Sequence, residues 1–384
     1  MAFLHKGYTC GTHRLVPPEE TFARLAPLIS SFGITRLADV TGLDRIGIPV
    51  YCAVRPSNRT LQVSNGKGLR HVDAKVSACM EAIELFHAEN PNDCFERASF
   101  KSMRRQYGDV IFPQVLPGHR REAFFSRDFL IDWVKATDLL RKREVWLAAS
   151  AAYLCTPSLY HWSSNGLASG NHLVEATLHG LYEVIERDAV SRLCTAKGQV
   201  VFSSNRCRFI DPRTLPSGQL GDLYRVLLAA NIKMALIHVE SCSPIHTFLA
   251  VLLDPQPFSN SSHVNIGYGT HLSSTVAAIR AITEAAQSRA IFIHGSREDL
   301  TPKAYGHSHD SLYQFFDGLE TTADWRRLRD HSSDDLLDDY DCVLRCLSEI
   351  GYKNIFRVNM MRRPFNIPVV KVFVSGFKMN INLF

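Results

Sequence analysis

The sequence predicts an α+β fold, in which long helices lie between short apolar strands. Four runs have the continuous apolar character of buried strands, namely IPVYCAVRP, MALIHVE, TFLAVLLD and VVKVFVSG. The long stretches between them include amphipathic helices, and of the 384 residues 46% are hydrophobic and 21% charged. This composition is typical of a globular protein with a large core. No linker marks a boundary, so we expect a single domain over residues 1–384, with room for subdomains.

Composition and charge also exclude several classes of protein. The net charge of +5 is modest, and the basic residues are not interleaved with aromatic ones, so we expect no nucleic-acid partner. No apolar run reaches the roughly 18 residues that span a bilayer, and the N-terminus lacks a signal-peptide core. The ten cysteines are dispersed without a C-x-x-C pair, as is usual for buried thiols in a reducing compartment. These features predict a cytoplasmic protein that does not enter a membrane.

The first segment with possible chemistry is Ser64–Gly68, which follows the strand-like run TLQV. Its glycines would allow an anion to approach the backbone, and Lys67 adds a positive charge. However, the sequence contains neither the P-loop pattern nor a dinucleotide-binding G-x-G-x-x-G after a strand. Taken alone, the segment is interpreted as an ordinary turn.

Residues 72–90 predict a helix that carries two acids on one face. Glu81 and Glu84 are three residues apart and therefore lie on the same side of the helix. Apolar residues such as Met80 and Ile83 flank them, so the carboxylates should lie partly inside the protein. Buried charges without a partner are costly, and a cation is therefore expected nearby.

Residues 163–192 repeat this pattern more strongly. A glycine-bearing turn leads into a helix with Glu183, Glu186 and Arg187 on one face, among apolar neighbours such as Leu181 and Ile185. Arg187 can neutralise only one of the two acids.

Two such helices facing each other would enclose four carboxylates, which suggests divalent cations. Oxygen-only ligands suit Mg²⁺ held together with nucleotide phosphates. A di-iron centre is the alternative, but it needs Glu-x-x-His on two helices, and only Glu84–His87 provides one. For either helix alone, solvated surface acids are the better interpretation, and it is the pairing that favours Mg²⁺-nucleotide.

A third helix, beginning near Thr275, carries Arg280, Glu284, Gln287 and Arg289. Guanidinium and amide groups beside a metal site are natural phosphate and ribose ligands. Farther along, the acidic stretch Asp310–Asp341 predicts a solvated helix and loop, and the apolar run from Pro368 to Val374 predicts a buried strand.

These three segments resemble the nucleotide-binding motifs of the YcaO family, and the resemblance extends from HKGYTCGTHR to IPVVKVFVSG. It implies a YcaO-type fold, with an ATP and Mg²⁺ site between carboxylate-bearing helices packed on mixed sheets. It also implies that ATP activates the amide oxygen of a peptide backbone, in a ribosomally synthesised peptide or a protein. The matching residues are Ser77, Glu81 and Glu84 in the first motif, Asn171, Glu175, Glu183, Glu186 and Arg187 in the second, and Glu284, Gln287 and Arg289 in the third.

The same resemblance assigns roles to these residues. Lys6 occupies the place of an adenine-contacting lysine, with His13 or Thr12 as its polar partner, and Lys67 is a further candidate for nucleotide binding. Glu186 and Arg187 are expected to act in catalysis. The expected metal ligands are Glu81, Glu84, Glu183 and Glu186.

Two departures from the family pattern affect the expected reaction. The first motif usually ends in arginine, where this chain has Leu85, so one positive group is lost. Azoline-forming members usually end in a PxPxP tail, whereas this chain ends VSGFKMNINLF. The N-terminal motifs are similar to those of members that act with a TfuA-type partner. We therefore expect thioamide formation, with azoline formation and a non-catalytic nucleotide-bound scaffold as alternatives.

The resemblance also predicts which partners the chain binds. Because it starts almost at Lys6, no fused peptide-recognition domain is expected, and a separate TfuA-type or peptide-presenting partner should deliver the peptide substrate. A homodimer is also expected.

Overall fold

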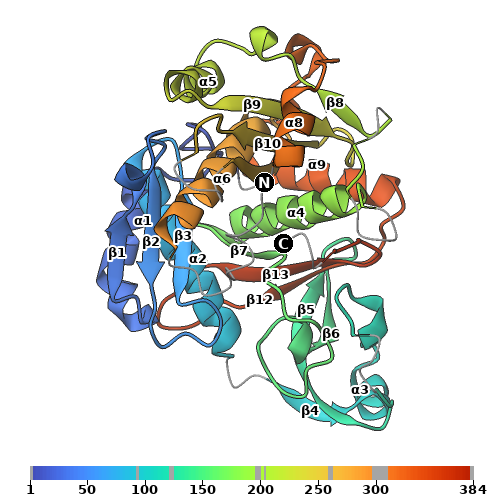
Figure 1. Ribbon diagram of the computed structural model, residues 1–384. Helices are drawn as coiled ribbons and strands as arrows, with labels where there is room; N and C mark the ends of the chain where they lie inside the picture. The colour runs from blue at the N-terminus through green and yellow to red at the C-terminus, as the bar shows by residue number, and fades with distance from the viewer. Residues whose placement is uncertain are drawn as a thin grey trace. The chain divides into compact units, whose positions relative to one another are not determined.

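The computed structural model describes residues 3–91, 95–120, 125–194, 200–202, 205–257, 263–295 and 310–380. The chain divides into two compact units, one made of residues 1–82 and 193–335 and the other of residues 83–192 and 336–384. Helices and sheets occur in both units, and the predicted α+β class is confirmed (Figure 1). The four predicted strands are all present, as β2 (Val50–Val54), β9 (Lys233–Val239), β10 (His246–Leu253) and β13 (Val369–Val374).

The first unit contains two antiparallel sheets. The smaller has the order β1-β2-β3, where β1 spans Arg36–Asp39 and β3 spans Val63–Lys67. Helix α1 (Pro18–Leu25) and the 3-10 turns η1 (Ala26–Phe32) and η2 (Thr41–Leu43) belong to the same part of the chain (Figure 1).

The larger sheet of the first unit has the order β11-β10-β9-β8, where β8 spans Cys207–Phe209 and β11 spans Val264–His271. Helix α6 (Ser274–His294) packs against β10 and β11, and α5 (Gln219–Ala229) packs against β9 and α6. All eight residues of β10 are buried, because it is hydrogen-bonded on both edges and covered by α6. Helix α8 (Asp310–Asp317) also contacts β9 and β10.

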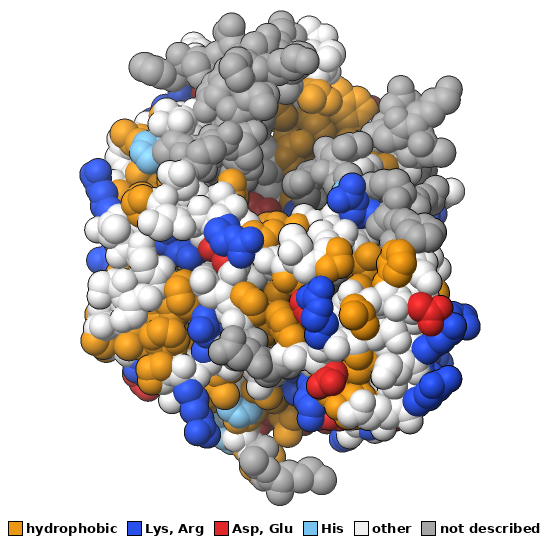
Figure 2. All heavy atoms as spheres, turned by 90° about the horizontal axis from the view of Figure 1, so that it is seen from below, with side chains coloured by type: hydrophobic (Ala, Val, Ile, Leu, Met, Phe, Trp, Pro, Cys, Tyr) orange, Lys and Arg blue, Asp and Glu red, His pale blue; other side chains and the backbone are white. Residues whose placement is uncertain are grey.

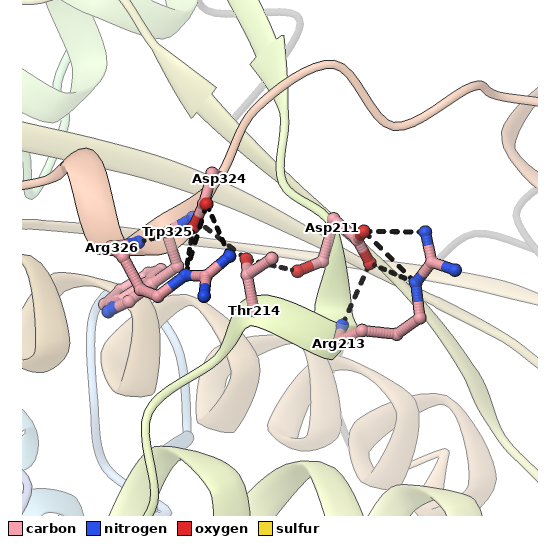
Figure 3. A network of polar contacts seen from close by, with 6 residues as sticks. All are labelled: Asp211, Arg213, Thr214, Asp324, Trp325 and Arg326. Carbon is pink, nitrogen blue, oxygen red and sulfur yellow. Dashed lines mark hydrogen bonds and ion pairs between the residues drawn. The ribbon is translucent and has the colours of Figure 1, made fainter.

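Two Asp–Arg pairs, each with an exposed arginine and a half-buried aspartate, stabilise the 3-10 turns η5 (Pro212–Thr214) and η7 (Trp325–Arg327) of this unit. Asp211 pairs with Arg213, and Asp324 pairs with Arg326, in each case with the arginine Nε donating to Oδ1 and Nη2 donating to Oδ2. Figure 3 shows how the two turns meet, because the backbone N–H of Trp325 donates to Thr214 Oγ1 at 2.9 Å. The Trp325 ring stacks on Phe248 of β10, which anchors this contact in the core.

The second unit is built on one antiparallel sheet of order β4-β5-β12-β13-β7, and β6 pairs with β5 off this path. The strand bounds are Glu96–Ser99 for β4, Leu130–Asp138 for β5, Arg143–Ala148 for β6, Leu167–Ser169 for β7 and Ile355–Asn359 for β12. Helix α4 (Leu173–Ser191) packs against β7 and β13, and α9 (Leu336–Glu349) packs on α4 (Figure 1). Helix α3 (Phe100–Tyr107) and the turns η3 (Pro113–Val115) and η4 (Ala149–Ala151) complete the unit.

Helix α2 (His71–Glu89) is continuous across the boundary at Ala82. It packs on β3 through Gly66, where an added Cβ would lie only 2.0 Å from the backbone nitrogen of Ala78 and 2.2 Å from the carbonyl oxygen of Ala74. Any larger residue at position 66 would therefore push strand and helix apart.

Three details differ from the sequence prediction. The segment at Ser64 is not a turn but belongs to strand β3, because its glycine admits the helix at close range. The sheets are not mixed, since every pairing between named strands of the described residues is antiparallel. The acidic stretch is not fully solvated either, because Asp335 accepts the Leu4 N–H and Asp339 is buried on the inner face of α9.

Among the helices of the described part of the chain, none has both the length and the apolar character needed to cross a membrane. On the face shown in Figure 2, the lysine and arginine side chains are interspersed with acidic, polar and apolar ones.

Candidate functional site

The predicted site residues lie mainly on three strand–helix pairs of the same kind. These pairs are β3–α2, β7–α4 and β11–α6, and their helices carry Glu81 and Glu84, Glu183 and Glu186, and Glu284 and Gln287, respectively. In each helix the two polar residues are three apart and so share a face. By unit, Ser77, Glu81, Glu284 and Gln287 belong to the first, whereas Glu84, Glu183 and Glu186 belong to the second.

Within the first unit, Lys67 and Glu284 form an ion pair. Lys67 Nζ at the end of β3 lies 2.5 Å from Glu284 Oε2 on α6, and both side chains are mostly covered. Lys67, a predicted nucleotide-binding residue, is therefore paired with a carboxylate of the third motif. Ser77 and Gln287 are half-buried on α2 and α6.

Lys6 and His13 also lie together, as the resemblance predicts for an adenine-contacting lysine and its partner. Lys6 Nζ is 2.9 Å from His13 Nδ1 and donates a hydrogen bond to the carbonyl oxygen of Ser333. Burial and the neighbouring Lys6 charge lower the pKa of His13 to about 4. Its ring packs edge-on against His271, whose pKa burial and His13 hold well below the usual value.

Because of such neutral histidines, the chain should lose stability as the pH falls from about 6.5 towards 4. Burial and the neighbouring His246 lower the pKa of His238 to about 4. Between these pH values the unfolded chain binds more protons than the folded one. The free energy of unfolding is therefore highest above pH 6.5, the pKa of histidine in the unfolded chain, and falls as the pH drops towards the folded pKa of about 4. For His238 alone the loss is at most about 3 kcal/mol.

Urea unfolding between pH 4 and 7 measures this effect. We expect the His238→Gln variant to lose less stability on acidification than the wild type, with His161→Gln, at an exposed position, as the control. Parallel pH profiles for wild type and His238→Gln would show that His238 contributes nothing to acid sensitivity.

Arg289 lies in a buried cluster of opposite charges in the first unit. Its Nε is 3.0 Å from both carboxylate oxygens of Asp44, and its Nη1 is 2.9 Å from Asp254 Oδ2. Arg45 Nη2 contacts Asp254 Oδ1 at 2.6 Å. Burial would raise the pKa of Asp254, but the hydrogen bond from Arg45 and the charge of Arg289 outweigh it and lower the pKa. The structure thus gives Arg289 two carboxylate partners, and its predicted contact with nucleotide stays a prediction.

Within the second unit, the first and second motifs meet at a hydroxyl group. Ser169 Oγ at the end of β7 donates to Glu84 Oε1 over 2.5 Å. Asn171 follows in the turn before α4, and both its backbone N–H and its side-chain amide donate to Glu175 Oε1. Glu175 is buried in the first turn of the helix, where the helix dipole favours a negative charge.

The remaining residues of the second motif lie about two to three turns farther along α4. Glu186 is only 4% exposed, whereas Glu183 and Arg187 are half-buried. Helix and sheet approach closely here, because a Cβ on Gly180 would lie 2.9 Å from Val372 Cγ2 and 3.0 Å from the carbonyl oxygen of Gly166.

Sequence reasoning missed Lys371, which lies in the middle of β13. This lysine is 4% exposed, and its ammonium donates to the carbonyl oxygen of Ser163. Burial lowers the pKa of Lys371 to about 8, although the charges of Glu183 and Glu84 act to raise it. The sequence did hold a signal, because Lys371 is the only charged residue in the apolar run VVKVFVSG. Predicting a buried strand for this run assigned no role to that lysine.

The donor set suits Mg²⁺ better than iron. Carboxylate and hydroxyl oxygens are hard ligands, and Mg²⁺ usually takes one or two carboxylates and completes its shell with phosphate oxygens and water. In the part of the chain that the structure describes, no three His, Cys, Asp or Glu residues form a metal cage by themselves. His87, the one histidine in the Glu-x-x-His spacing that the di-iron reading relied on, instead contacts the Ile83 carbonyl oxygen at 2.7 Å through Nδ1.

Comparisons with known proteins bear on this site. The family model described as YcaO cyclodehydratase, ATP- and Mg²⁺-binding, matches residues 65–378. An uncharacterized protein of Methanothermobacter thermautotrophicus is 32% identical over 94% of this chain and 94% of its own length. A protein of Rhizobium leguminosarum bv. trifolii, named as lying in the tfuA 3′ region, is 33% identical over 96% of this chain and 89% of its own length.

Two solved structures have the same fold. The YcaO protein of Methanopyrus kandleri, bound with AMPPCP and Mg²⁺, matches with a TM-score of 0.76 and 23% identity over 98% of this chain and 95% of its own. A heterocyclase in complex with substrate and cofactor matches with a TM-score of 0.79 and 21% identity, over 99% of this chain and 54% of its own. At these identities the likeness is one of fold.

Proposed function

Because the chain belongs to the YcaO family, we propose that it uses ATP to activate a backbone amide of a peptide and that its product is a thioamide. The family is described as ATP- and Mg²⁺-binding, and these are the cofactors of the chain. The observation that carries the thioamide assignment is the name of the Rhizobium relative, which places that protein beside tfuA. A TfuA-type protein is accordingly the proposed partner.

In the proposed reaction, the amide oxygen of the peptide takes the γ-phosphoryl group of ATP, and ADP leaves. Sulfide adds to the amide carbon, and phosphate then departs with the original oxygen. Bound Mg²⁺ would neutralise charge on the phosphates. We assign Glu81, Glu84, Glu183 and Glu186 to hold it.

The chain's other residues would position ATP and stabilise charge. Arg187, on the same helix as Glu183 and Glu186, is proposed to contact a phosphate oxygen through its planar fork. Asn171, in the turn before α4, and Glu175, in the first turn of this helix, are proposed to contact the nucleotide. Lys6 and His13 are proposed to contact the adenine. Fixed charges of this kind contribute most when they are placed before the reaction begins.

Azoline formation is the second candidate, and the family description as cyclodehydratase favours it. There the nucleophile is a Ser, Thr or Cys side chain of the peptide itself, and the activation of the amide oxygen is the same. A scaffold that binds ATP without turning it over is a third candidate of another class.

The mass of a candidate peptide separates these functions. The peptide is incubated with the chain, a TfuA-type partner, ATP, Mg²⁺ and sulfide. Thioamide formation adds about 16 Da, and azoline formation removes about 18 Da, because one exchanges oxygen for sulfur and the other loses water. We expect the gain, and only when sulfide is present. A loss of water would assign azoline formation, and ATP binding without any mass change would assign the scaffold.

A further inference from the structure

The β13–β7 strand pair brings a buried lysine to the acids of the first and second motifs. In this antiparallel pair, Val369 is opposite Ser169 and Lys371 is opposite Leu167. Directly opposed residues and residues two apart share a face of the sheet, so Ser169 and Lys371 are diagonal neighbours on one face. Ser169 in turn donates to Glu84 at 2.5 Å.

The charge of a second carboxylate, from another element, acts on the same ammonium. The charges of both Glu183, on α4, and Glu84, on α2, act on Lys371, which is buried and donates to the carbonyl oxygen of Ser163. An ammonium and two carboxylates from three elements are thus gathered in the second unit. Such a buried group keeps its charges only when they compensate one another.

We propose that Lys371 is the resting counter-cation of Glu84 and Glu183, which it holds in place and partly neutralises whenever Mg²⁺ with nucleotide is absent. Lys371 is therefore a positioning residue, because it acts through the two carboxylates. The inference rests on the proposed function, since it takes both glutamates as magnesium ligands. Lys371 would also supply a positive charge close to Glu84. The next residue, Leu85, stands where the family usually has an arginine.

The decisive variant is Lys371→Gln, which keeps a hydrogen-bond donor at the end of its side chain but carries no charge. Without metal, its Tm should fall by roughly 3 °C or more, because two carboxylates lose their cation. Added Mg²⁺ should then raise the Tm of the variant more than that of the wild type. Lys371→Arg, which keeps the charge, should respond like the wild type. Lys353→Gln, at an exposed lysine of the same unit, is the matched control.

A double variant keeps the test valid even if Lys371→Gln folds poorly. Removing one carboxylate as well, in Glu84→Gln with Lys371→Gln, should recover most of the lost Tm, because the charge imbalance is smaller. A further loss of Tm in the double variant would overturn the proposal and make Lys371 a packing residue. An equal response of wild type and Lys371→Gln to Mg²⁺ would overturn it too.

The proposed function can fail separately. Calorimetry of the wild type with Mg²⁺ and AMPPCP tests whether the chain binds nucleotide with metal at all. The coupling between Glu84 and Lys371 is measured from Tm values without metal or nucleotide. Its outcome therefore does not depend on whether the calorimetry detects nucleotide binding.

Discussion

Replacing Glu186 with glutamine is expected to abolish Mg²⁺-dependent use of ATP while the chain stays folded. The substitution preserves the shape of a side chain that is 4% exposed on α4 but removes the charge that we propose attracts the metal. Loss of one electrostatic contact to the reacting groups typically lowers turnover by about 100- to 1,000-fold. Calorimetric titration with nucleotide at several Mg²⁺ concentrations, together with the rate of ATP hydrolysis in the presence of peptide and partner, measures both effects.

The control for this experiment is Glu144→Gln, because Glu144 is an exposed acid on β6 that pairs only at the surface. It should leave nucleotide binding and turnover unchanged. If Glu186→Gln binds nucleotide with wild-type affinity and the same dependence on Mg²⁺, Glu186 is not a metal ligand. Iron recovered with the purified protein at stoichiometric level would instead favour the di-iron centre.

The second large effect is expected at Arg289, where replacement with methionine should destabilise the chain by about 3–5 kcal/mol. The substitution keeps the apolar stem but takes the guanidinium away from both oxygens of Asp44, and it leaves Asp254 with the Arg45 guanidinium and the backbone N–H of Gln256. The side chains of both aspartates are less than a tenth exposed, so their charges cannot be solvated instead. The free energy of unfolding in urea gives the loss directly.

Arg45→Met supplies the comparison for Arg289→Met. Its side chain is 38% exposed and Asp254 would keep Arg289, so a clearly smaller loss is expected. Adding Asp44→Asn to Arg289→Met should recover part of the stability by removing one unpaired charge. If Arg289→Met is nearly as stable as the wild type but no longer binds nucleotide, the arginine contacts phosphate, as the motif predicted.

Strands β2, β9, β10 and β13 were accessible from the sequence because they are long enough to show their apolar pattern. The run that forms β10 is apolar at nearly every position, and the structure buries it on both faces. Strand β3 escaped recognition because Ser64, Asn65 and Gly66 have low strand propensity. They form a strand because Gly66 lets α2 approach, and this tertiary contact leaves no periodic signal in the sequence.

The candidate site was predictable to the extent that its residues recur at helical spacing. The pairs Glu81 with Glu84 and Glu183 with Glu186 could be found because three residues make nearly one turn. Lys371 could not, because strand register places it diagonal to Ser169, which donates to Glu84, and distance along the chain does not show this. The partners of Arg289 were missed for the same reason, since Asp44 is 245 residues away from it.

The place of β13 in its sheet has a consequence for the order in which the protein is made. Strands β5 and β7 are synthesised early, but β12 and β13 fill the gap between them and come last. While the ribosome is still adding residues, the end of β5 at Thr137 and Asp138 therefore lacks β12, and the edge of β7 lacks β13. Unpaired strand edges invite association with other chains. The hairpin that ends this exposure also carries Lys371, so the nascent chain gains its closed sheet and the counter-charge for Glu84 and Glu183 in a single late step.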